Sequence, residues 1–122
     1  MKRLKSGFTL VEIMIVVAII ALLAVIAIPS FASARVRAQR TACINNLRQI
    51  DGAKDQWALD NNQPPTATPG WGDLIGVTEG YIKSMPQCPA GGGDQTYDIG
   101  DLTTNPSCSA VADHVLPAAA AP

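Results

Sequence analysis

Residues 5–12 read Lys-Ser-Gly-Phe-Thr-Leu-Val-Glu, and this stretch separates a short basic leader from a long apolar run. The 21 residues from Phe8 to Ile28 contain one charged side chain, Glu12. An apolar segment of this length is long enough to cross a bilayer as a helix. A charge in hydrocarbon costs about 2.5 to 3.5 kcal/mol on insertion scales, so we expect Glu12 to have a function and a cationic partner.

The Gly7-Phe8 junction, with Glu12 and the apolar helix after it, resembles the class III signal of type IV prepilins and type II secretion pseudopilins. The resemblance implies that the prepilin peptidase cuts between Gly7 and Phe8 and that the new Phe8 amine is N-methylated. It also implies an assembly role for Glu12, which would pair with the N-terminal amine of a neighbouring subunit. A carboxylate near a helix N-terminus is further favoured by the helix dipole.

Two other interpretations of this region are open. An ordinary secretory signal could end at the Ala32-Ser33-Ala34 sequence. The apolar part of such a signal is only about 7 to 15 residues long, however, and the run from Phe8 to Ile28 has 21 residues. A plain single-span anchor would let Glu12 reach the headgroup region, which its position near the start of the span makes easy. The Gly7-Phe8 junction favours the prepilin interpretation over both.

The predicted fold class is α+β. A long N-terminal α-helix, with a transmembrane half and an amphipathic half, is expected to carry a small C-terminal domain with a short antiparallel β-sheet. The expected parts are the leader at 1–7, the transmembrane and assembly half of the helix at 8–29, the amphipathic half at 30–62, a small globular loop and sheet region at 63–116, and a flexible tail at 117–122.

The helix has three predicted features. Pro29 is expected to produce a helix kink, because proline removes an intrahelical hydrogen bond. Asn61-Asn62, followed by two prolines, predicts the end of the helix. A stripe on one face of this amphipathic half is expected to hold the globular domain, and its residues recur at helical spacing: Cys43, Leu47, Ile50, Lys54 and Trp57.

The region after the helix is rich in Pro, Gly, Thr and Asp and has only short apolar runs. We expect a short helix or turn at 74–77, a brief strand at 81–82, and a strand with period-two alternation at 96–100. A tight turn is predicted at 91–94. Together these patterns predict a sheet of two or three strands.

The charge is divided unevenly along the chain. Residues 1–40 hold six basic residues and one acidic residue, whereas residues 41–122 hold three basic and nine acidic residues. Basic residues flank both ends of the apolar span, so charge counting does not set its orientation. The resemblance places the N-terminus in the cytoplasm, where the peptidase site must lie.

The odd number of cysteines needs an explanation. We favour a disulfide between Cys88 and Cys108, which could add about 3 kcal/mol of stability, with Cys43 as a buried apolar residue. The alternative is a zinc site made by Cys43, Cys88, Cys108 and His114, which form a Cys3His ligand set. Calcium is a weaker possibility, because Asp94, Asp98 and Asp101 lie near turns but form no EF-hand pattern.

No motif for catalysis is found in the sequence, so we expect no enzyme activity. Binding of nucleic acid is disfavoured because the region after the helix is acidic. The expected function is a structural subunit of a type IV pilus-like or type II secretion pseudopilus filament. The alternative is a single-span membrane-anchored binding module that does not polymerise.

The resemblance also implies where the chain acts and with which partners. The precursor is expected in the bacterial inner membrane, and the mature subunit in a periplasmic or cell-surface filament. Its expected partners are other subunits of a homopolymer, the prepilin peptidase and methyltransferase, the inner-membrane assembly platform, and the lipid bilayer before assembly.

Overall fold

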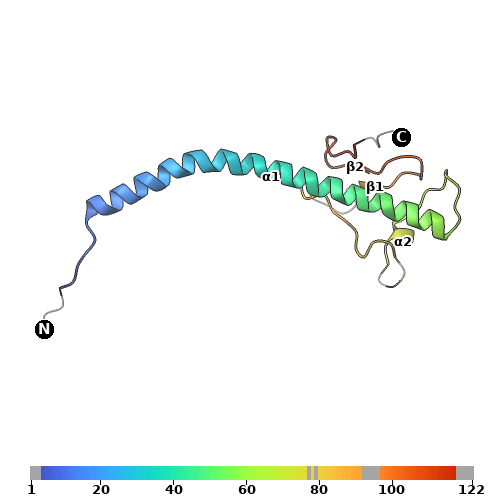
Figure 1. Cartoon of the computed structure of the whole chain (residues 1–122), viewed down its shortest axis with the longest axis horizontal. Helices are drawn as coiled ribbons and strands as arrows, with labels where there is room; N and C mark the ends of the chain where they lie inside the picture. The colour runs from blue at the N-terminus through green and yellow to red at the C-terminus, as the bar shows by residue number, and fades with distance from the viewer. Residues whose placement is uncertain (1–3, 77, 79, 92–96, 118–122) are drawn as a thin grey trace. The chain divides into compact units, whose positions relative to one another are not determined.

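The computed structural model describes residues 4–76, 78, 80–91 and 97–117. Its elements are α1 (Leu10–Asp60), α2 (Trp71–Leu74), β1 (Tyr97–Asp98) and β2 (Ser107–Cys108) (Figure 1). This α+β composition, with one long N-terminal helix and a two-stranded antiparallel sheet, confirms the predicted fold class. The chain divides into two compact units, Met1–Arg35 and Val36–Pro122, and α1 contributes to both.

The first unit contains the apolar part of α1. Every large apolar side chain from Phe8 to Phe31 is at least 48% exposed. A window of α1 with a mean hydropathy of 3.2 is long and apolar enough to cross a membrane. The helix continues through Pro29, so the proline does not end it, and the kink at this residue stays a prediction. So much exposed apolar surface must be covered by lipid or by other chains.

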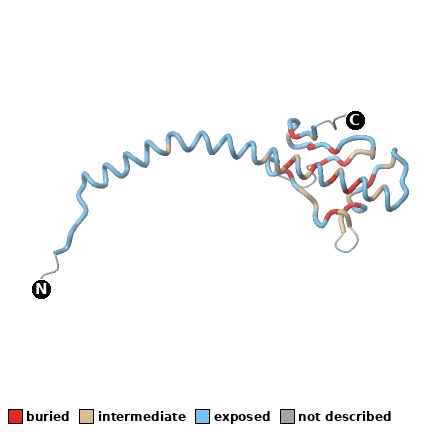
Figure 2. Tube along the Cα trace, in the orientation of Figure 1, coloured by how far each residue is buried: buried red, intermediate tan, exposed pale blue. Residues whose placement is uncertain are grey.

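The second unit is built on the stripe predicted from the sequence. Its buried residues (red in Figure 2) include Cys43, Leu47 and Ile50, each 0% exposed, and Lys54, 1% exposed. Trp57, the last member of the stripe, is partly buried and packs against the same core. Helical spacing therefore predicted the face of α1 that contacts the rest of this unit.

The C-terminus of α1 has a defined cap. The helix ends at Asp60, two residues before the predicted end at 62. Asn62 adopts the left-handed conformation with φ of 49°, and the Gln63 amide donates a hydrogen bond of 2.9 Å to the Ala58 carbonyl. This bond spans the left-handed residue, which is the pattern of a Schellman cap, and it explains why the Asn pair marks the end of the helix.

The remaining elements are short. Strand β1 pairs with β2 in the register Tyr97 to Cys108, and an isolated parallel bridge joins Ile75 to Ile82. Helix α2 overlaps the expected helix or turn at 74–77 at Leu74, and β1 lies inside the expected strand at 96–100. The expected brief strand at 81–82 is present only as the bridge of Ile82. The predicted turn at 91–94 lies mostly outside the described residues.

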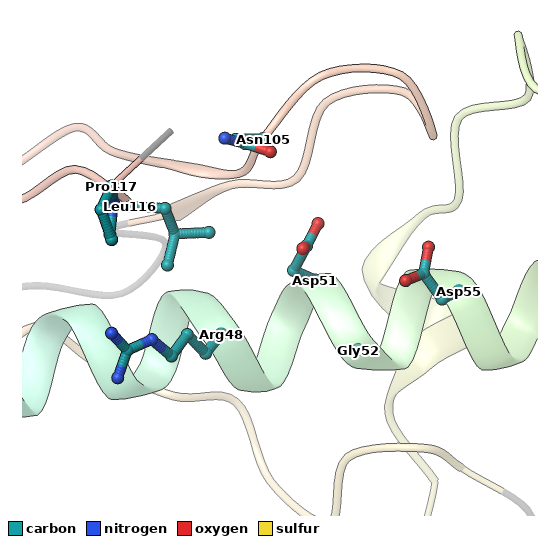
Figure 3. Close-up of a pocket in the computed structure, with 7 residues that line it drawn as sticks. All are labelled: Arg48, Asp51, Gly52, Asp55, Asn105, Leu116 and Pro117. Atoms are coloured by element: carbon teal, nitrogen blue, oxygen red, sulfur yellow. The ribbon is translucent and has the colours of Figure 1, made fainter. Parts of the chain in front are cut away.

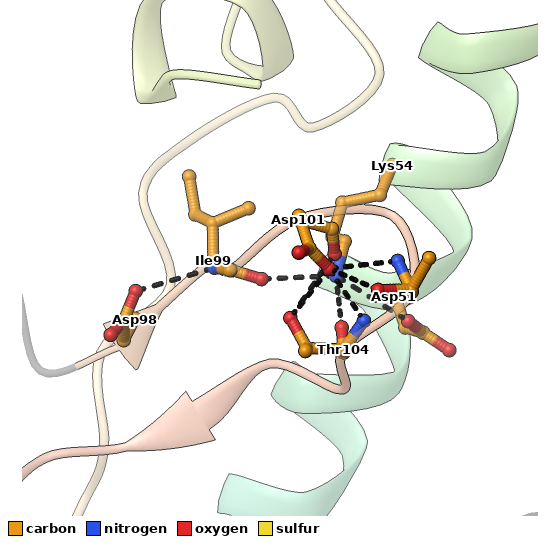
Figure 4. Close-up of polar contacts among 8 residues, drawn as sticks. Asp51, Lys54, Asp98, Ile99, Asp101 and Thr104 are labelled. Atoms are coloured by element: carbon orange, nitrogen blue, oxygen red, sulfur yellow. Dashed lines mark hydrogen bonds and ion pairs between the residues drawn. The ribbon is translucent and has the colours of Figure 1, made fainter. Parts of the chain in front are cut away.

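Lys54 attaches the loop between β1 and β2 to helix α1 (Figure 4). Its Nζ donates hydrogen bonds to the carbonyl oxygens of Ile99 at 3.0 Å and Thr104 at 2.6 Å, and lies 4.0 Å from Asp51 Oδ1. Burial lowers the pKa of Lys54, while the negative charges of Asp51 and Asp101 act in the opposite direction. A buried cation therefore serves as the donor that satisfies two loop carbonyls.

The Asp101 carboxylate stabilises the same loop through hydrogen bonds with residues of the loop itself. One carboxylate oxygen, Oδ1, accepts hydrogen bonds from the backbone amides of Thr103 at 2.9 Å and Thr104 at 2.8 Å. It also accepts bonds from both threonine hydroxyls, at 2.7 and 3.0 Å. These donors lower the pKa of Asp101 because they stabilise the ionised carboxylate.

Gly100 is the residue of this loop whose backbone requires glycine. Its φ is +65°, and a Cβ there would lie 2.5 Å from Thr104 Oγ1. We expect Gly100→Ala to lower the free energy of unfolding by about 2 kcal/mol, from left-handed strain and displacement of the threonine. Gly52→Ala is the control, because a Cβ there meets no atom within 4 Å and should stabilise α1 by about 0.5 to 1 kcal/mol. Denaturant unfolding followed by tryptophan fluorescence measures both, and equal effects would contradict the prediction.

Candidate functional site

The start of α1 forms a capping box around Glu12. The Glu12 amide donates to Thr9 Oγ1 at 3.2 Å, and the Thr9 amide donates to Glu12 Oε2 at 3.5 Å. The arrangement satisfies two amides that a helix N-terminus leaves without intrahelical partners. Thr9 was not predicted from the sequence to have this role, although the pattern Thr-x-x-Glu at residues 9–12 indicates a capping box.

Gly7, Phe8 and Glu12 lie around one hollow of about 230 Å³, together with Ser6. Phe8 is 83% exposed, and a Cβ at Gly7 would meet no atom within 4 Å. The fold therefore has no steric need for glycine at position 7. An exposed, non-helical segment before α1 is also what a peptidase needs for access to the Gly7-Phe8 bond.

The second unit brings together four potential metal ligands. One ligand atom from each of Cys43, Cys88, Cys108 and His114 lies within 4.8 Å of the others, and all four residues are buried. They come from α1, from the segment after Ile82, from β2 and from the C-terminal segment. Cys88 Sγ lies 3.5 Å from His114 Nδ1. These are the residues of the zinc alternative predicted from the sequence.

Polar groups surround two of these thiols. The Tyr97 hydroxyl donates to Cys43 Sγ at 3.4 Å and accepts a bond of 3.0 Å from Asn46 Nδ2. Burial raises the pKa of Cys43 to about 12. Burial would also raise the pKa of Cys88, but hydrogen bonds from the Ala90 amide, His114 and the other two cysteines outweigh it and lower that pKa to about 7. Tyr97 and Asn46 carried no sequence signal for this role, because nothing in the pattern places them beside Cys43.

The predicted Cys88–Cys108 disulfide is not formed in the structure. All three cysteines lie in the described part of the chain, no bond joins any two of them there, and the pairing stays a prediction. Cys43, which is a buried apolar residue in the disulfide prediction and a ligand in the zinc alternative, lies in the same cluster. The sequence could not show this, because the convergence depends on how coil segments pack against α1.

The calcium alternative receives no support from the geometry. Asp94 lies outside the described residues, and the Asp101 carboxylate is occupied by the two threonines. Asp98 Oδ1 accepts a bond from the Gly100 amide. Within the described ranges, the only group of three or more potential metal ligands is the cysteine and histidine cluster.

A pocket of about 320 Å³ lies between α1 and the C-terminal part of the second unit (Figure 3). Arg48, Asp51 and Asp55 contribute its charged groups. Both signs of charge are present, and the pocket contains no cysteine or histidine. The lining therefore indicates no specific ligand and no catalytic chemistry.

Comparison with known proteins defines the family. Residues 2–28 match the prokaryotic N-terminal methylation motif. The type II secretion system core protein G of Aeromonas hydrophila is 32% identical over 112 residues, which are 83% of this chain and 78% of the relative. The chain belongs to the type II secretion system core protein G family.

Two further relatives give the same result. Core protein G of Klebsiella pneumoniae is 32% identical over 107 residues, covering 79% of this chain and 76% of the relative. Core protein G of Vibrio cholerae is 30% identical over 112 residues, covering 84% and 77%. No solved structure matches the chain.

The predicted resemblance to pilin-like proteins is thus confirmed, and the family is the secretion pseudopilin rather than the pilus branch. This core protein G homologue is a structural, non-enzymatic pseudopilin with an N-terminal methylation motif. Its apolar helix and its relatives indicate an inner-membrane precursor and a periplasmic pseudopilus, assembled with other components of the secretion system.

Proposed function

We propose that this pseudopilin is cut between Gly7 and Phe8, N-methylated on Phe8, and polymerised through the exposed apolar part of α1. The observation that carries the proposal is the methylation motif at 2–28, combined with an apolar surface that has no cover within its own unit. In the membrane this surface is covered by lipid, and in the filament by the same helix of other subunits. Burial of apolar surface between helices then holds the polymer together.

Glu12 provides the polar part of this assembly. Cleavage converts the Gly7-Phe8 amide into a positively charged amine at Phe8, which supplies a cationic partner for Glu12. In low dielectric, the carboxylate of one subunit and the amine of its neighbour attract strongly, and neither has water as an alternative. The pairing therefore positions an incoming subunit and makes assembly depend on cleavage.

The proposed orientation follows from the cleavage site. Residues 1–7 lie in the cytoplasm, where prepilin peptidase acts, the apolar helix crosses the inner membrane, and the acidic second unit lies in the periplasm. The direct partners are further copies of this chain, the peptidase and methyltransferase, and the inner-membrane assembly platform. The membrane-anchored binding module has no specific observation in its favour.

Replacement of Glu12 separates its charge from its capping role. Glutamine can fill the third position of a capping box, so Glu12→Gln keeps the cap and removes the charge, whereas Glu12→Ala removes both. We expect both variants to lose pseudopilus incorporation by at least about tenfold, the effect of 1.4 kcal/mol of lost pairing. Cross-linking or shearing of filaments from cells that express the full chain measures incorporation.

Thr9→Ala is the matched control, because it removes the cap partner and leaves the carboxylate in place. We expect this variant to be cleaved and incorporated. If Glu12→Gln assembles normally and Thr9→Ala does not, then helix capping, rather than charge pairing, is the role of Glu12, and the proposed assembly mechanism fails.

A further inference from the structure

Outside the N-terminal methylation motif and the apolar part of α1, the strongest unexplained feature is a buried group of three thiols and one imidazole. The exposed fractions are 0% for Cys43, 1% for Cys88, 7% for Cys108 and 5% for His114. Four side chains with metal-binding atoms converge from four separate segments of the second unit. We propose that Cys43, Cys88, Cys108 and His114 bind one structural zinc ion.

The spacing of the ligand atoms is close to what zinc requires. In a tetrahedral site with Zn–S bonds of 2.3 Å, two sulfurs lie about 3.8 Å apart, and a sulfur and an imidazole nitrogen about 3.6 Å. Cys88 Sγ and His114 Nδ1 are 3.5 Å apart, and no pair of the four atoms exceeds 4.8 Å. A contraction of roughly 1.2 Å at most between any two ligand atoms, within reach of side-chain rotation, gives tetrahedral spacing.

The ligand set selects the metal class and the type of site. Three thiolates with one imidazole in tetrahedral geometry are typical of zinc, and four protein ligands leave no open position for a substrate. A disulfide between two of the cysteines would not explain why the third thiol and the imidazole are buried beside them. A metal ion uses all four groups.

Neighbouring donors suit a site that carries negative charge. Binding replaces three thiol protons with one Zn²⁺, so the three thiolates and the neutral imidazole leave a single net negative charge. The Tyr97 hydroxyl donates to Cys43 Sγ, and the Ala90 amide hydrogen-bonds Cys88. Such outer donors orient the ligands and stabilise thiolates. Asn46 fixes the tyrosine, since its Nδ2 bonds both the Tyr97 hydroxyl and the Gln87 carbonyl.

The second unit also needs a cross-link of this kind. Among the described residues, its sheet has two strands of two residues each, and six large apolar side chains are buried in its core. Small domains with modest cores are commonly stabilised by disulfides or metals. Zinc would connect α1, the segment after Ile82, β2 and the C-terminal segment at one point.

The first test uses the full chain, purified from membranes in detergent without chelator. We expect one zinc per chain by elemental analysis, and three thiols that resist alkylation until a chelator removes the metal. A chain isolated with a Cys88–Cys108 disulfide would overturn the proposal. A chain isolated as apo protein with three reactive thiols would also overturn it if added zinc or cobalt is not taken up at one ion per chain.

The second test uses cobalt as a spectroscopic probe of the same chain. Co²⁺ in a tetrahedral thiolate site gives visible d–d bands and a thiolate charge-transfer band. Cys43→Ser should lower the charge-transfer intensity by about one third, because one of three thiolates is lost. His114→Ala should weaken binding at least about tenfold while leaving the sulfur bands. Ala42→Ser, which alters a neighbouring position on α1, is the control and should bind like the unmodified chain.

The two tests are independent of filament assembly. If Cys43→Ser does not fold, zinc content and thiol protection in the unmodified chain still test whether the chain binds zinc. Unchanged cobalt spectra and affinity in both ligand variants would show that the ion binds elsewhere and would overturn the assignment. A zinc-free chain that assembles normally would leave the pseudopilin function intact and remove only the metal site.

Discussion

A Lys54→Met chain is expected to lose about 2 to 4 kcal/mol of unfolding free energy, a fall in melting temperature of roughly 10 to 25 °C. Methionine keeps the length of the buried stem but donates no hydrogen bond. The carbonyls of Ile99 and Thr104 then lose their donor, at about 1 to 3 kcal/mol each. Part of this cost is offset because methionine buries no charge.

The measurement uses denaturant unfolding of the full chain in detergent. Trp57 and Trp71 pack against the core, so their fluorescence reports unfolding of the second unit. Lys83→Met is the matched control, because Lys83 is exposed, and we expect it to change stability by less than about 0.5 kcal/mol. Equal midpoints for the two variants would show that the buried ammonium does not hold the loop.

A Gly7→Val chain is expected to retain its leader and to be absent from the pseudopilus. The fold itself should be unaffected, because a Cβ at Gly7 meets no atom within 4 Å. The effect must then arise in the peptidase, which has to accommodate the side chain that precedes the scissile bond. Cleavage slower by at least about tenfold corresponds to 1.4 kcal/mol of lost transition-state stabilisation.

Mass spectrometry of the full chain from membranes separates the possible results. The unmodified chain should begin at a methylated Phe8, whereas Gly7→Val should keep residues 1–7. Ser6→Ala is the control, since it alters the neighbouring residue and leaves the Gly7-Phe8 bond unchanged. If residues 1–7 are removed normally from the valine variant, the peptidase does not depend on glycine at position 7, and the prediction is contradicted.

Most features of α1 follow from its local sequence. The apolar run, the stripe from Cys43 to Trp57 and the end near Asn62 were all predictable, because each depends on residues close in sequence. Helical periodicity places such residues on one face whatever else the chain does. The capping partner Thr9 is equally local, because it lies three residues before Glu12 in the pattern Thr-x-x-Glu.

The hydrogen-bond partners of Lys54 could not be predicted from its local sequence. Its place on the buried stripe followed from helical spacing, but its role did not. The carbonyls of Ile99 and Thr104 that receive its hydrogen bonds lie about fifty positions further along the chain. Backbone acceptors leave no mark in the amino-acid pattern, so only the folded loop identifies them.

The sequence by itself determined the apolar part of α1 that is long enough to cross a membrane, the motif around Gly7 and Glu12, and the face of α1 that carries the second unit. These properties depend on length, apolarity and short-range spacing. Only the tertiary structure showed that all three cysteines and His114 lie together in one buried cluster. These four residues come from a helix, a strand and two coil segments with no common period, so only packing brings them together.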